Sequence, residues 1–128
     1  MKTFSQETEL REEMVNAVTH GVGVLFGLVS VPLLILNACK SCGQFVIAGI
    51  AIYGFCFLMV FTFSSLFHLQ KEGKSRHTFK ILDHISIYFF IAGTYTPFIL
   101  IFVNNAFGLT LLAILWLLAL AGTIFKTF

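Results

Sequence analysis

Side chains with acid–base and metal-binding chemistry stand at the ends of long apolar runs in this sequence. One run ends in SSLFH, residues 64–68, and the next begins with DHISIY, residues 83–88, and leads to AGTYTP, residues 92–97. Imidazole and carboxylate groups are ordinary ligands of Zn²⁺, and a zinc-bound water has a pKa of about 7. The pattern therefore predicts a polar site that holds zinc, with Asp83 as a ligand or as the acceptor of a proton from the bound water.

The spacing of these residues supports a shared site. On a helix, side chains three or four positions apart lie on the same face. Ser64 could therefore hydrogen-bond or orient the imidazole of His68. Three sets of polar residues have this spacing: Glu13, Asn16 and His20; Ser64 and His68; His84 and Tyr88.

The composition indicates a membrane protein. Hydrophobic residues make up 58% of the chain and charged residues only 11%, whereas soluble domains carry about 25% charged residues. Apolar stretches of roughly 20 residues can cross a bilayer as helices. The net charge of +2 does not indicate nucleic-acid binding, because the basic residues sit in connections and not in a patch with interleaved aromatics.

We expect an all-α integral membrane protein with a polar N-terminal segment, residues 1–19, followed by a transmembrane domain, residues 20–128. Its four spans are predicted at about residues 20–36, 45–69, 83–103 and 109–125. Ionisable groups at the ends of spans usually face the interior of a helix bundle, where they define functional sites.

The basic residues predict the orientation. Of the 8 Lys and Arg residues, all but Lys40 fall on one side if the four spans alternate, and basic loops stay in the cytoplasm. We therefore predict a cytoplasmic N-terminus, which also places His20, His68, Asp83 and His84 at the cytoplasmic ends of their spans.

Other interpretations remain open for single residues. A histidine near a span end can simply anchor the helix at the interface, and Asp83 can pair with Lys80 as a surface ion pair of little energetic weight. Pro97 is expected to end or kink the third span. The C-x-x-C of Cys39 and Cys42 lacks the βαβ context of a redox motif, so a disulfide or two free thiols is the default interpretation.

The motifs resemble those of the hemolysin III family, which is similar to the progestin and adipoQ receptors and, more distantly, to alkaline ceramidases. The resemblance rests on residues 13–21, 64–68, 83–88 and 92–97 and covers nearly the whole chain. It implies a bundle of seven transmembrane helices with a zinc site near the cytoplasmic side. It also implies that His68 ligates zinc, that Asp83 holds or activates the zinc-bound water, and that Ser64 supports His68.

This sequence departs from the family pattern after its fourth span. The family supplies its remaining zinc ligands from a late His-x-x-x-His, and no histidine follows His84. We therefore expect a chain truncated after four of seven helices, with an incomplete ligand set that the missing C-terminal helices or another chain completes.

Three functions are compatible with these features. The first is a metal-dependent hydrolase in the bacterial inner membrane that cleaves a lipid amide or ester. The second is a pore-forming or channel-like membrane protein, which the family name suggests. The third is a non-catalytic membrane sensor or stress protein.

Overall fold

Four long helices make up the chain, as its apolar pattern predicts. The computed structural model describes residues 3–128, so Lys2, counted in the charge pattern, lies outside the described residues. The helices are α1 (Phe4–Ala38), α2 (Gln44–Leu69), α3 (Lys74–Phe102) and α4 (Ala106–Thr127). Each is long and apolar enough to cross a membrane. The prediction of an all-α integral membrane protein is confirmed, and the environment of its helices is a lipid bilayer.

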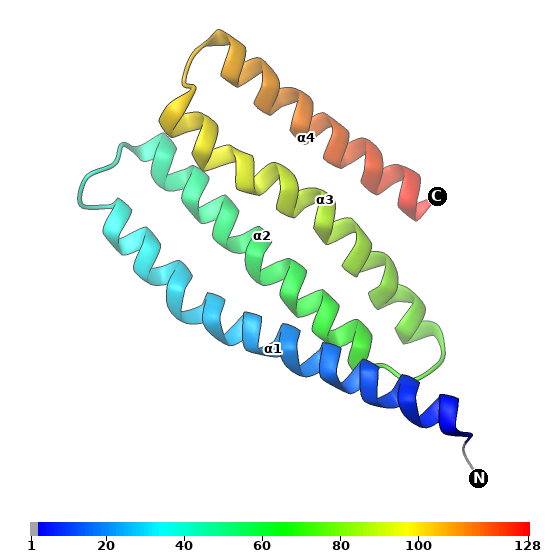
Figure 1. Cartoon of the computed structure of the whole chain (residues 1–128). Helices are drawn as coiled ribbons and strands as arrows, with labels where there is room; N and C mark the ends of the chain where they lie inside the picture. Colours follow the sequence, from blue (N-terminus) through cyan, green and yellow to red (C-terminus); the bar gives the residue numbers. More distant parts are fainter. Residues whose placement is uncertain (1–2) are drawn as a thin grey trace.

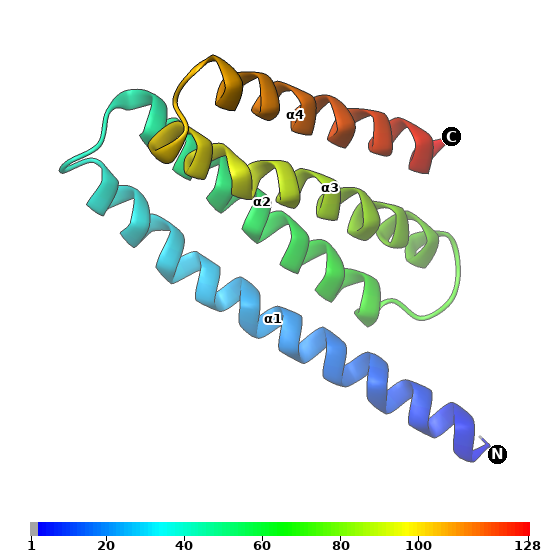
Figure 2. The same cartoon turned by 45° about the horizontal axis from the view of Figure 1, so that its top comes forward.

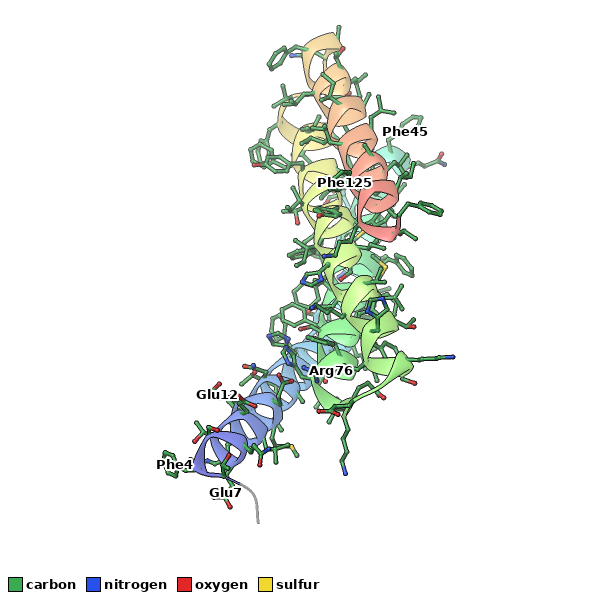
Figure 3. All side chains as sticks on the ribbon, turned by 90° about the vertical axis from the view of Figure 1, so that its right-hand side faces the viewer. Phe4, Glu7, Glu12, Phe45, Arg76 and Phe125 are labelled. Carbon is green, nitrogen blue, oxygen red and sulfur yellow. The ribbon has the colours of Figure 1, made fainter. Side chains whose placement is uncertain are left out.

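Helix α1 extends well beyond its apolar part. It runs for 35 residues without interruption, which corresponds to about 52 Å at 1.5 Å per residue, whereas the hydrocarbon core is about 30 Å thick. Most of the polar segment predicted to precede the first span is therefore helical and continuous with it. Figure 3 shows this part of α1, with Phe4, Glu7 and Glu12, projecting away from the other helices.

The connections are shorter than the sequence predicts. Helix α3 begins at Lys74, directly after Gly73, whose φ of 118° is a conformation that glycine adopts without steric cost. Helix α4 begins at Ala106, because the Asn105 side chain accepts a hydrogen bond from the Gly108 amide at 3.0 Å and caps the first turn. Of the two effects expected of Pro97, ending or kinking the third span, the first is not seen, since α3 continues through Pro97 to Phe102.

The helices form a single curved row in which each backbone packs only against its neighbours in the chain. Figures 1 and 2 show the order α1, α2, α3, α4, with successive helices running in opposite directions. The start of α1, the α2–α3 connection and the end of α4 share one end of the row (Figure 1), which we call the N-terminal end. The SSLFH motif lies at this end of α2, and the DHISIY motif follows in the first half of α3.

Small residues bring the helices close together. Gly23 faces the Phe61 ring, and a Cβ added at Gly27 would lie 2.7 Å from Leu58, as the four-residue spacing of these glycines predicts. A Cβ at Gly93 would lie 2.9 Å from the Cys56 sulfur, so α2 and α3 also approach closely. Close backbone approach maximises dispersion contacts between helices that lipid already solvates well.

Replacement of Gly93 by Leu is expected to separate α2 from α3 and to lower stability by about 1–3 kcal/mol, a typical effect of overpacking. Gly43→Ala is the matched control, because no atom lies within 4 Å of a Cβ placed there. The midpoint of unfolding in mixed micelles measures both changes. Equal midpoints for the two variants would contradict this packing.

The predicted orientation can be tested by cysteine labelling. A chain that keeps only the exposed Cys39 should react with a membrane-impermeant maleimide on intact cells, because Cys39 precedes the α1–α2 connection on the predicted outer side. A cysteine-free chain with Lys74→Cys should react only after the membrane is permeabilised. The reverse result would show that the N-terminus is outside.

Candidate metal and acid–base site at the N-terminal end

Polar side chains join α1 to α2 at the N-terminal end of the row. His20 Nδ1 and Ser64 Oγ are hydrogen-bonded, and the Ser65 hydroxyl donates to the Ala17 carbonyl at 2.9 Å. The His20 and His68 rings lie edge to face with centroids 5.7 Å apart. Two of the chain's four histidines are thus neighbours, one from each helix.

A second group of contacts surrounds the carboxylate of Glu13. The Nδ1–H of His68 donates to Glu13 Oε2 at 2.8 Å, and the guanidinium of Arg76 donates to Glu13 Oε1 at 3.2 Å. Arg76 also donates to the Gln70 carbonyl at 2.9 Å and lies 4.5 Å above the centre of the Phe67 ring. Figure 3 shows Arg76 where α1 meets the α2–α3 connection.

Glu13 lies ahead of the apolar part of α1, and its neighbours favour the ionised carboxylate. Partial burial acts to raise its pKa, but the hydrogen bonds from His68 and Arg76, together with their positive charge, outweigh this effect. The net result is a pKa below the ordinary value for Glu.

The partner of Ser64 differs from the one expected. The four-residue spacing suggested that Ser64 orients His68, but the hydrogen bond of its buried hydroxyl goes to His20, and His68 is held by Glu13. Spacing along α2 places Ser64 and His68 on one face, but the rotation of α1 decides which α1 side chain each of them meets.

The remaining predicted residues are less closely associated. Asp83 is half-buried, and no hydrogen bond or ion pair involves its carboxylate within residues 3–128, so the alternative pairing with Lys80 is not seen. The neighbouring His84 has a buried Nδ1 without a hydrogen-bond partner. Tyr88 packs on α4 at Gly122, and Asn16 is exposed.

The donors suit zinc in kind but are too few for a complete site. A neutral imidazole whose Nδ1–H is hydrogen-bonded to a carboxylate is typical of a metal ligand, and His68 has this arrangement. A catalytic zinc site takes three protein ligands. In the described part of the chain, no three His, Cys, Asp or Glu side chains are grouped closely enough to hold a metal ion.

Arg76 is the residue of this site that the sequence analysis missed. In the sequence it lies among the basic residues between the second and third predicted spans, which indicate only the orientation. Its position in the sequence could have indicated this role. Arg76 follows His68 by a few residues, and acidic residues that could pair with it precede the first span.

Fold and site together define a class of protein. This is a multi-span α-helical membrane protein with a cluster of histidine, carboxylate and guanidinium groups at one end of its helices. Residues 8–128 match the family described as Haemolysin-III related, and the chain belongs to this family.

Several curated proteins are similar to the chain. It is 42% identical to Hemolysin-3 of Bacillus cereus over 119 residues, which cover 93% of this chain and 54% of that protein. It is 40% identical to a Hemolysin-3 homolog of Bacillus subtilis, covering 93% and 56% of the two chains. The human Monocyte to macrophage differentiation factor is 30% identical, with 89% and 49% covered. The chain therefore spans about half the length of these relatives, and no solved structure matches it.

Ser64→Ala is expected to lower stability by about 1–3 kcal/mol, because it leaves the partly buried His20 Nδ1 without its partner. Ser75→Ala removes an exposed hydroxyl and should have almost no effect. Unfolding midpoints of the two variants in the same detergent measure the difference. A Ser64→Ala midpoint equal to that of wild type would show that the His20–Ser64 bond contributes nothing.

Proposed function

We propose that this chain contributes part of the zinc centre of a membrane hydrolase that cleaves the amide or ester bond of a lipid. The observation that supports the proposal is the imidazole of His68. It lies beside His20 at the end of the apolar spans, and its Nδ1–H is hydrogen-bonded to a carboxylate. The proposed site faces the cytoplasm, and the Bacillus relatives favour a bacterial plasma membrane.

Each residue has a distinct role in this proposal. His68 binds the metal through its second ring nitrogen. Zinc held there would lower the pKa of a bound water molecule to about 7 and so supply the nucleophile for hydrolysis. Asp83 would help to hold the metal or would accept the proton released in hydrolysis of the C–N or C–O bond. Asp83 then returns the proton to the leaving nitrogen or oxygen. The remaining ligands come from helices outside this chain or from another chain.

The relatives' names support two alternative functions. Hemolysin-3 suggests a pore, and a differentiation factor suggests signalling without catalysis. A water-filled pore requires polar side chains through the whole depth of the spans, whereas the polar clusters of α1 and α2 lie at one end. This distribution favours the hydrolase over the pore.

Zinc content and lipid hydrolysis test the proposal directly. Purified together with the helices or the second chain that complete the ligand set, the protein should bind zinc, and His68→Ala should reduce the bound zinc at least tenfold, because the variant lacks a ligand. His77→Ala is the control and should leave the zinc content unchanged, since His77 is exposed on α3. Asp83→Asn should abolish release of fatty acid from a lipid amide or ester.

The alternatives give different results. Wild-type protein that binds no zinc even with the completing helices or second chain present would overturn the zinc hydrolase. Ion flux in proteoliposomes that persists in both His68→Ala and Asp83→Asn would instead favour the pore. Zinc binding by the wild type without hydrolysis of any lipid amide or ester would favour a structural metal in a sensor.

A further inference from the structure

Each oxygen of the Glu13 carboxylate accepts a hydrogen bond from a side chain on a different helix. Oε2 accepts from His68 on α2, and Oε1 accepts from Arg76 on α3. No other described hydrogen bond or aromatic contact joins side chains of helices that are not neighbours in the row. The carboxylate therefore has little freedom to rotate, since each oxygen is engaged by a different donor.

This arrangement determines which nitrogen of His68 carries the hydrogen. An ionised carboxylate can only accept hydrogen bonds, and a neutral imidazole has one N–H and one lone pair. Because Nδ1 lies 2.8 Å from Glu13 Oε2, Nδ1 carries the hydrogen and Nε2 keeps the lone pair. A metal ligand needs that lone pair.

We propose that Glu13 is a positioning residue that holds His68 as the Nδ1–H tautomer and thereby directs the Nε2 lone pair toward a divalent metal ion, with Arg76 holding Glu13 in place. The inference rests on the proposed metal site and adds to it the roles of Glu13 and Arg76. Orientation of ligating histidines by carboxylates typically contributes 10–100-fold in metal affinity.

Arg76 is suited to this task by its other contacts. Its guanidinium donates to the Gln70 carbonyl at 2.9 Å and rests on the Phe67 ring, so its position is fixed by the end of α2 as well as by Glu13. The planar guanidinium can hold several acceptors at once, which a lysine ammonium in the same place does with less geometric control.

His20 provides an internal comparison. Its Nδ1 is bonded to the Ser64 hydroxyl, which can either donate or accept. Nothing in that contact selects one tautomer of His20. Of the two neighbouring imidazoles, only His68 has its tautomer set by its partner.

The tautomer can be measured by ¹⁵N NMR of the histidine-labelled chain in micelles, in the pH range in which the spectrum shows neutral imidazole. His68 should carry its proton on Nδ1 in the wild type. In Glu13→Gln the amide can either donate or accept, so the proton should distribute over both nitrogens. Glu12→Gln is the matched control, because Glu12 is exposed, and it should leave the spectrum unchanged.

Metal affinity gives the second measurement. Titration with Co²⁺ or Zn²⁺ should show 10–100-fold weaker binding in Glu13→Gln and a smaller loss in Arg76→Lys, which keeps the charge. Lys74→Met, an exposed control in the same turn of α3, should bind as wild type does.

The results separate this inference from the metal site itself. Wild-type metal binding that depends on neither Glu13 nor the tautomer of His68 would overturn the inference and leave the metal site intact. A His68 tautomer that depends on Glu13, in a protein that binds no metal even with the completing helices or second chain present, would overturn the proposed zinc site and with it this inference. A purely structural brace between helices would lower stability in Glu13→Gln but leave the tautomer unchanged, which also overturns the inference.

Discussion

Helices in a lipid bilayer gain almost nothing from burying apolar side chains against one another, because lipid chains solvate those side chains equally well. Packing must therefore be fixed by close contact and by polar bonds. In this chain, small residues such as Gly27 and Gly93 provide the close contacts along the helices. Hydrogen bonds at the N-terminal end provide the second constraint, and they set the rotation of α1 against α2.

The same polar groups that fix the packing constitute the candidate site. Each of the His20–Ser64 and His68–Glu13 bonds joins α1 to α2. A substitution at these positions therefore changes both the stability of the helix pair and the chemistry of the imidazoles. At the other end of α3, the Trp116 N–H donates to Thr96 at 3.0 Å and ties α4 to α3 without any group that could ligate a metal.

The sequence predicted the features that depend on local pattern. Apolar runs gave the number of helices, and alternation of the spans placed His20 and His68 at the same end, where their rings are neighbours. Features that depend on the rotation of one helix against another were not predictable. The exchange of partners, in which Ser64 meets His20 and His68 meets Glu13, is of this kind.

The observed helices differ from the predicted spans in two further ways, and both have local causes that residue spacing alone does not reveal. The apolar pattern marks only the part of each helix inside the membrane. Helical structure can continue into the polar residues outside it, and this explains why α1 begins at Phe4 and α3 at Lys74. Pro97 was expected to end or kink the third span, and it does not end it. The third span continues through it, because neighbouring helices and local adjustments can accommodate proline in membrane helices.

The row arrangement has a consequence for assembly. Because each backbone touches only its predecessor and successor, every helix can dock as soon as it enters the bilayer, in the order of synthesis. Arg76 is the exception, since it reaches from α3 past α2 to Glu13 on α1. The first two helices can pair alone, but the carboxylate between them remains without its guanidinium until the third arrives. Arrival of the third helix thus completes the polar cluster.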